Sequence, residues 1–72
     1  MASDICLKFG ARLRKLRKAR NWRQLDLAEQ AGISENYISE VELGQKEVCL
    51  RTQLALAIAL GVKLEELLSG ID

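Results

Sequence analysis

Polar side chains that can donate and accept hydrogen bonds are grouped in one short stretch of this chain. Residues 34–40 carry hydroxyl, amide and carboxylate groups at helical spacing. An asparagine can pair with adenine, and a glutamate can accept a hydrogen bond from the amino group of cytosine. On an ordinary exposed helix the same glutamates would be solvated charges only. The candidates for base contacts in the major groove are Ser34, Glu35, Asn36, Ser39 and Glu40.

Positive charge is concentrated near the N-terminus, although the net charge of the 72 residues is only +1. From Lys8 to Arg23 the chain holds eight of its eleven basic residues and no acidic residue. Such a basic stripe is expected where the partner carries phosphates, whereas many charged runs are merely solvated helix faces. The candidate phosphate contacts are Arg23, Gln24, Tyr37, Lys46 and Arg51. Gln24 can alternatively help to cap its helix, and Lys46 and Arg51 can be merely solvated.

No group of residues is arranged for catalysis or for metal binding. The chain has no histidine, and Cys6 and Cys49 are too far apart to suggest a zinc knuckle. No exposed serine or cysteine adjoins a plausible base, and there is no glycine-rich phosphate loop. We therefore predict no enzyme activity, no cofactor and no metal, and no small-molecule pocket is evident.

Compartment and redox state follow from the hydropathy pattern. The N-terminus has no apolar run of signal-peptide length, and nothing approaches the ~20 apolar residues of a membrane span. We therefore expect a cytoplasmic protein that does not enter the membrane. Both cysteines are expected to be reduced there, although the pair could in principle form a disulfide.

Helices are the elements expected to position these side chains. Proline is absent, and no β-branched run alternates with a period of two residues. We predict an all-α bundle of four to five short helices, forming a single domain over residues 1–72. The apolar spacing places the helices at about 3–20, 24–31, 35–43, 51–60 and 62–68.

The apolar positions also predict how the bundle packs. Ile5, Phe9, Leu13 and Leu16 share one face of the first helix. Trp22 is expected to cover the core between the first two helices. These positions leave the cations of the first helix on its remaining faces.

A sharp turn joins the second and third helices. Gly32 can adopt the positive φ that ends a helix, and Ser34 is placed to cap the next one. Because Ile38 and Val41 must face the core, the polar side chains of the third helix must face outward. This is the pattern of a helix-turn-helix, whose second helix can enter the major groove of DNA.

The fourth helix has more apolar surface than one core requires. Leu54 and Ile58 form a second stripe on it, which indicates a subunit interface in a protein this small. Residues of the fifth helix can extend that surface, so that residues 51–68 also serve dimerisation. The predicted interface comprises Leu54, Ile58, Leu64, Leu67 and Leu68. Alternatively, the fifth helix folds back and hides the stripe.

Together these residues resemble the Cro/C1-type (phage-repressor-like, XRE) helix-turn-helix regulators over about residues 9–68. The resemblance is carried by RLRKLRKARNW, AGIS, YISEVELG, LALAIALGV and LEELL. The third-helix pattern in so short a chain is also similar to the controller proteins of restriction–modification systems. The chain differs in having Arg23 where the family has a Ser or Thr cap, and Gln53-Leu54 in an unusual order. Its base-reading face, with Glu35 and Glu40, is also unusually acidic.

The resemblance implies a homodimer on a two-fold-symmetric operator in double-stranded DNA, acting as repressor or activator of transcription. It implies that Gln24 clamps a phosphate and that the base-contact candidates face the groove. It also implies a structural ion pair between Arg17 and Glu42, which ties the first helix to the third. The alternative is a protein-interaction module, an antitoxin or adaptor that keeps the fold without specific DNA binding. The acidic third helix favours that alternative.

Overall fold

The computed structural model describes the backbone of residues 2–71 and the side chains from Ile5 to Ile71. Five helices and no strand occur over these residues, which confirms the predicted all-α fold. Only the last helix is clearly shorter than predicted. The helices are α1 (Ala2–Ala19), α2 (Gln24–Ala31), α3 (Glu35–Glu42), α4 (Leu50–Leu60) and α5 (Leu64–Leu67).

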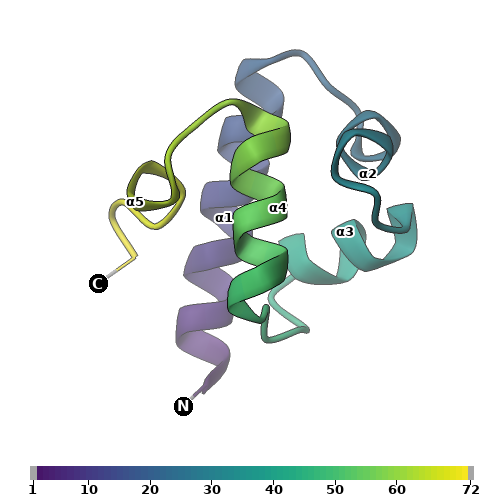
Figure 1. Ribbon diagram of the computed structural model, residues 1–72. Coiled ribbons are helices and arrows are strands. Elements are labelled where there is room, and N and C mark those ends of the chain that lie inside the picture. The colour runs from purple at the N-terminus through teal and green to yellow at the C-terminus, as the bar shows by residue number, and fades with distance from the viewer. Residues whose placement is uncertain (1, 72) are drawn as a thin grey trace.

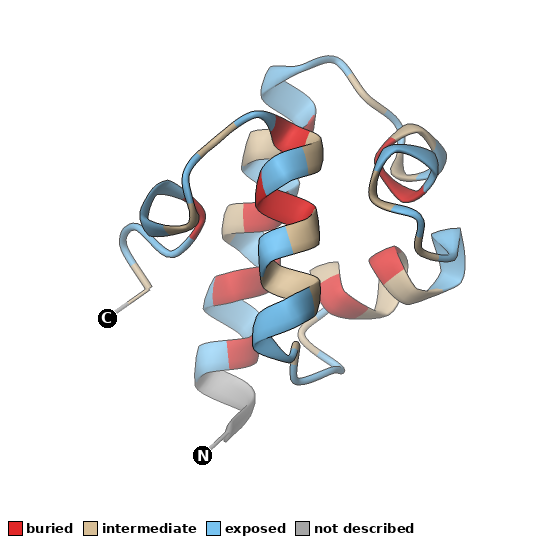
Figure 2. Ribbon diagram, viewed as in Figure 1, coloured by how far each residue is buried: buried red, intermediate tan, exposed pale blue. Residues whose placement is uncertain are grey.

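The helices surround one core to which all five contribute. Figure 1 shows α2 and α3 to one side of α1 and α4, and α5 to the other. Helix α3 contacts α1 and α2, while α5 contacts α4 and α1. Figure 2 shows the buried residues on the inward sides of the ribbons. The core consists of Phe9, Leu13, Leu27, Ala28, Ile38, Val41, Leu56, Ala57, Leu60 and Leu67.

The first turns of α1 differ from the prediction. Phe9 and Leu13 are buried as expected and Leu16 packs against the core, but Ile5 is 63% exposed. Cys6 is buried in its place. At about 100° per residue, Cys6 lies about 60° around the helix from Phe9, on the same side as the buried Gly10, Leu13 and Arg17, whereas Ile5 lies about 40° from Phe9 on the opposite side. The prediction for Ile5 was wrong for this reason.

A close crossing of α1 and α3 depends on Gly10, which sequence analysis did not single out. A Cβ atom at this position would lie 2.3 Å from the carbonyl oxygen of Val41 and 2.7 Å from that of Glu42. Real Cβ atoms do not approach backbone oxygens so closely. The absence of a side chain at Gly10 therefore sets the distance between the two helices.

The turn between α2 and α3 has the predicted geometry. Gly32 has φ +70°, and the backbone N–H of Ile33 donates to the carbonyl oxygen of Ala28. Ser34 caps α3, since its hydroxyl oxygen accepts from the backbone N–H of Tyr37 at 3.1 Å. These two residues orient α3 relative to α2.

The described residues also show the state of the cysteines and whether membrane-spanning helices or groups of metal ligands occur among them. Both cysteines are free thiols, Cys6 buried and Cys49 exposed, as predicted. Over residues 2–71 none of the helices has the length and apolar character needed to cross a membrane. In the same part of the chain no three potential metal ligands come together.

Candidate nucleic-acid interface

The outer face of α3 carries the candidate base contacts. Ile38 and Val41 are buried, so this helix has one inward side and one outward side. Glu35 and Asn36 are exposed, and so is Ser34 at the cap. Ser39 and Glu40 are half-buried. The structure therefore brings all five candidates to one surface, with the two at the N-terminal end of α3 the most accessible.

Two of the candidate contacts on α3 have structural roles as well. The Ser34 oxygen accepts one hydrogen bond in the cap, which leaves its hydroxyl hydrogen to donate to a base or a phosphate and a second lone pair to accept from a base. Tyr37 is half-buried and packs against the core. Burial raises the pKa of its phenol, with smaller contributions from Cys49 and Glu40, and the hydroxyl stays protonated as a donor.

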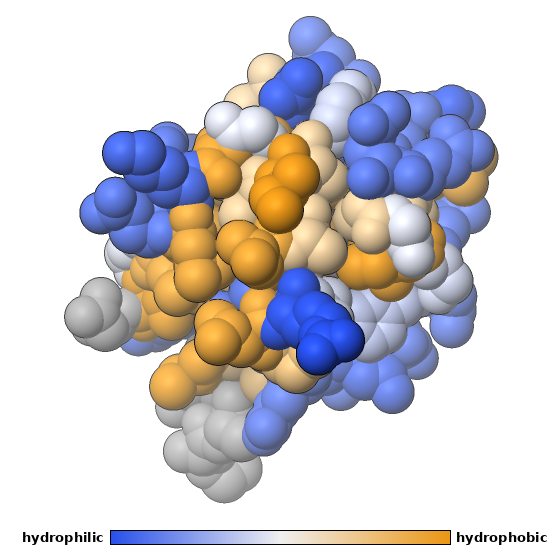
Figure 3. Space-filling model, in the orientation of Figure 1, coloured by the Kyte–Doolittle hydropathy of each residue, from blue (hydrophilic) through white to orange (hydrophobic). Residues whose placement is uncertain are grey.

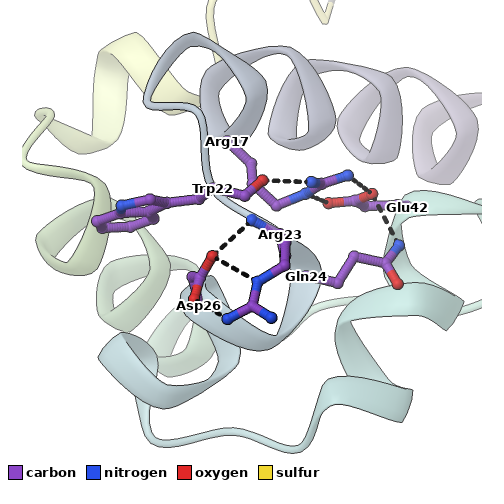
Figure 4. Close-up of polar contacts among 6 residues, drawn as sticks. All are labelled: Arg17, Trp22, Arg23, Gln24, Asp26 and Glu42. Atoms are coloured by element: carbon purple, nitrogen blue, oxygen red, sulfur yellow. Dashed lines mark hydrogen bonds and ion pairs between the residues drawn. The ribbon is translucent and has the colours of Figure 1, made fainter.

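Beneath this face lies a buried ion pair, drawn in Figure 4. Arg17 donates from Nε to Oε2 of Glu42 at 2.7 Å and from Nη2 to Oε1 at 2.9 Å. Its Nη1 donates to the carbonyl oxygen of Trp22 at 2.7 Å. The two side chains are only 8% and 4% exposed. The hydrogen bond with Glu42 raises the pKa of Arg17, so the guanidinium stays charged. The pair links α1 to the end of α3 and to the turn before α2.

Gln24, at the first position of α2, belongs to the same network. Its Nε2 donates to Oε1 of Glu42 at 3.0 Å. An amide nitrogen carries two hydrogens, so one N–H remains to meet a phosphate. The side chain is thus held near the N-terminus of α2, where backbone N–H groups favour an anion.

Arg23 is the N-cap residue of α2, where the resemblance predicts a Ser or Thr. Asp26 supplies the cap instead, since its Oδ2 accepts from the backbone N–H of Arg23 at 2.8 Å. The Arg23 guanidinium also donates to both carboxylate oxygens, at 3.2 and 3.0 Å. These hydrogen bonds raise the pKa of Arg23 and lower the pKa of Asp26. A phosphate would have to compete with Asp26 for this guanidinium.

Other arginines near α1 hold the ends of helices, which their sequence pattern did not indicate. Arg12 donates twice to the carbonyl oxygen of Glu66 in α5, at 3.1 and 2.8 Å. Arg20 donates to the carbonyl oxygen of Leu60 at 2.8 Å and lies 4.4 Å from the centre of the Trp22 ring. Trp22 covers the core as predicted. Lys46 and Arg51 are both exposed, so they remain available to phosphates.

An apolar stripe crosses the outer face of α4. Leu54 is 49% exposed and Ile58 is 70% exposed, so α5 does not hide them. Leu50, one turn before Leu54, is 67% exposed and extends the stripe, which the i, i+4 spacing could have indicated. Figure 3 shows hydrophobic atoms gathered over α4 on this face. We call Leu50, Leu54 and Ile58 the α4 stripe.

Helix α5 contributes less to this surface than predicted. Leu67 is fully buried in the core of its own protomer, so its placement at the interface was wrong. Leu64 also packs against the core, whereas Leu68 remains 36% exposed. Leu64 and Leu67 are three positions apart and share the side of α5 that meets α4 and α1, whereas Leu68 lies just past the last residue of α5.

A hollow of about 300 Å³ adjoins Leu68, although no pocket was evident from the sequence. Apolar side chains line most of it, including Phe9, Val48 and Ile71. Lys46 and Gln53 also reach it, and the Gln53 amide donates to the carbonyl oxygen of Val48 at 2.8 Å.

Comparison with known proteins identifies the family. Residues 13–67 match the family HTH_3, described as helix-turn-helix. This chain belongs to the HTH_3 family. The match confirms the predicted resemblance to the helix-turn-helix family.

Three relatives illustrate the similarity. The control protein C.MunI of a Mycoplasma species is 35% identical over 71 residues, which cover 97% of this HTH_3 protein and 96% of C.MunI. The crystal structure of the restriction-modification controller protein C.AhdI from Aeromonas hydrophila has 44% identity and a TM-score of 0.84, covering 86% of this chain and 94% of that one. The HTH-type transcriptional regulator DdrOP3 of Deinococcus deserti is 38% identical over 92% of this chain. The chain spans about half of DdrOP3, 51% of its length.

Proposed function

We propose that this chain is a sequence-specific DNA-binding regulator that acts as a homodimer on a two-fold-symmetric operator. The observation that carries the proposal is the division of α3 into a buried side, with Ile38 and Val41, and an outward side with Glu35 and Asn36. Similarity to controller proteins over nearly the whole chain supports it. Such a protein acts where the DNA lies, which in a bacterial cell is the cytoplasm.

In this proposal α3 enters the major groove with its N-terminal end foremost. Asn36 can pair with adenine, and Glu35 can accept from a cytosine amino group. Phosphates on either side are held by groups around α3. On one side these are Gln24, at the start of α2, and Arg23 once it leaves Asp26. On the other side they are Lys46, Arg51 and the Tyr37 hydroxyl.

The acidic groups on α3 favour discrimination over affinity. A carboxylate near the phosphates is repelled unless a base donates a hydrogen bond to it. Glu35 and Glu40 would therefore reject sequences that lack a donor at the matching position.

The α4 stripe supplies the proposed dimer contact, together with Leu68 at its edge. Contiguous exposed apolar side chains on a small protein mark an interaction surface. The single domain then has two roles, with α3 reading DNA and α4 and α5 joining the protomers. Joining two protomers there would set two α3 helices in successive major grooves, about 34 Å apart.

Selection of bound duplexes from a random pool tests the proposal directly. A two-fold-symmetric consensus is the expected result, because a dimer reads two related half-sites. If the chain enriches no duplex but binds a protein partner through α3, the protein-interaction alternative is correct instead.

Substitutions at Asn36 and Lys46 are expected to act differently on DNA binding. Asn36→Ala should cost about 1–3 kcal/mol on the selected duplex and relax base preference at one position of each half-site. Lys46→Ala should weaken binding to all duplexes alike and lower the slope of log K against log salt by about one per protomer. Binding measured by fluorescence anisotropy at several salt concentrations separates these effects. Equal losses of specificity in both variants would contradict the assigned roles.

Ile58→Glu is expected to break the dimer without unfolding the protomer. The side chain is 70% exposed in the protomer, so a charge costs little there but would be buried at the interface. Light scattering should show the wild type at twice 8.1 kDa and the variant at 8.1 kDa. Leu43→Glu is the matched control, because Leu43 is 60% exposed and lies outside the α4 stripe. A wild type that remains monomeric at high concentration, with and without DNA, would rule out this interface.

A further inference from the structure

The face of α1 that turns away from α3 carries a cluster of cations. Gly10 marks the side of α1 that meets α3, through its contacts with Val41 and Glu42. Positions 8, 12 and 15 lie about 140–160° around the helix from position 10. Figure 1 shows α5 and α3 on opposite sides of α1, and the cluster faces the α5 side.

These cations border a shallow hollow of about 440 Å³ between α1 and the segment after α5. Arg12 is held in place by its two hydrogen bonds to the carbonyl oxygen of Glu66. Lys8 and Lys15 are exposed on either side of it, about 10 Å apart along the helix axis. We call this site the basic hollow; its lining residues are Lys8, Ala11, Arg12, Lys15, Ser69 and Gly70.

The geometry points to the basic hollow as a second binding surface for the phosphates of duplex DNA, separate from the surface around α3. This second surface goes beyond the proposed function, because a duplex whose major groove holds α3 would lie on the other side of α1. One particle could then hold two DNA segments at once, one by sequence and one by charge.

The chemistry of the lining favours duplex DNA over other partners. A protein interface needs a buried apolar or aromatic anchor, and the lining has no large apolar side chain. A single-stranded nucleic acid needs aromatic side chains on which its bases stack, and the lining has none. Phosphate contacts need only cations along a groove. Among the residues that the structure describes, no acidic side chain lines the basic hollow to oppose this charge.

A bridging experiment with the full chain tests the inference. Beads carrying one short duplex of mixed sequence are loaded with protein, washed, and offered the same duplex labelled with fluorescein. The wild type should capture the labelled duplex, and Lys8→Ala/Lys15→Ala should lose most of that capture. The salt slope of binding should also fall by about two per protomer in the double variant.

The control is Lys18→Ala/Lys63→Ala, which removes the same charge from exposed positions outside the basic hollow. It should capture the labelled duplex as the wild type does, and thermal unfolding should be unchanged in both double variants. The inference is overturned if the wild type captures no labelled duplex, or if Lys8→Ala/Lys15→Ala captures as much of it as the wild type does. Binding of poly-glutamate at the hollow in place of the duplex overturns it in favour of an acidic protein partner. If the chain selects no operator from a random pool, the bridging experiment still tests the basic hollow, because both of its duplexes have mixed sequence.

Discussion

Glu42→Ala is expected to destabilise the protomer by about 3 kcal/mol, or roughly 150-fold in the folding equilibrium. The substitution leaves the Arg17 guanidinium in a site where its side chain is 8% exposed, with only the Trp22 carbonyl as a polar partner. A buried charge without its counter-ion costs far more than the pair contributes. Gln24 also loses the acceptor of its amide.

Urea unfolding followed by circular dichroism measures this loss, with all variants at one protein concentration because the proposed dimer would make stability concentration-dependent. Arg23→Ala is the matched control. It removes the Arg23–Asp26 pair, in which the arginine is 76% exposed, and keeps the Asp26 cap on the backbone. Solvent screens an exposed pair, which therefore contributes little to stability, so this variant should unfold close to the wild type. Equal losses of unfolding free energy in the two variants would show that burial does not determine how much the Arg17–Glu42 pair contributes to stability.

Gly10→Ala is expected to destabilise the protomer by about 3 kcal/mol, although alanine is the better helix former by roughly 0.5–1 kcal/mol. The added Cβ would lie 2.3 Å from one backbone oxygen of α3 and 2.7 Å from the next, and backbone atoms cannot swing aside as a side chain can. α1 and α3 would have to separate. For a domain of this size the melting temperature should fall by about 12–24 °C.

Gly32→Ala serves as the comparison for Gly10→Ala. At Gly32 an added Cβ meets nothing within 4 Å, and only the positive φ opposes it. That strain costs about 1–2 kcal/mol. The Gly10 variant should therefore be the less stable of the two in the same urea titration. A Gly10 variant as stable as the wild type would mean that α1 and α3 lie farther apart than in this structure.

The helix-turn-helix could be predicted from sequence because its signals are local. Gly32 and Ser34 act through their own backbone angles and hydrogen bonds, which neighbouring residues determine. Ile38 and Val41 define the inward side of α3 by spacing alone. The outward placement of Asn36 follows from the same periodicity.

The roles of the arginines were less predictable. Arg12 and Arg20 sit in the same basic run as Lys8 and Lys15, and no local pattern separates a side chain that will bind a helix end from one that will stay free. The partners of Arg12 and Arg20 lie 54 and 40 residues away. Only packing of the helices brings those carbonyl oxygens within reach.

By itself the sequence determined the helical class, the turn before α3, the outward set of polar side chains and the family. The tertiary structure decided that Leu67 belongs to the core, that Ile5 turns to solvent, and that Gly10 sets the approach of α1 to α3. It also separated the cations into those that hold the fold and those that remain for a partner. The physical reason is range: periodicity and capping act within a few residues, whereas burial and hydrogen bonds between helices depend on where distant segments come to lie.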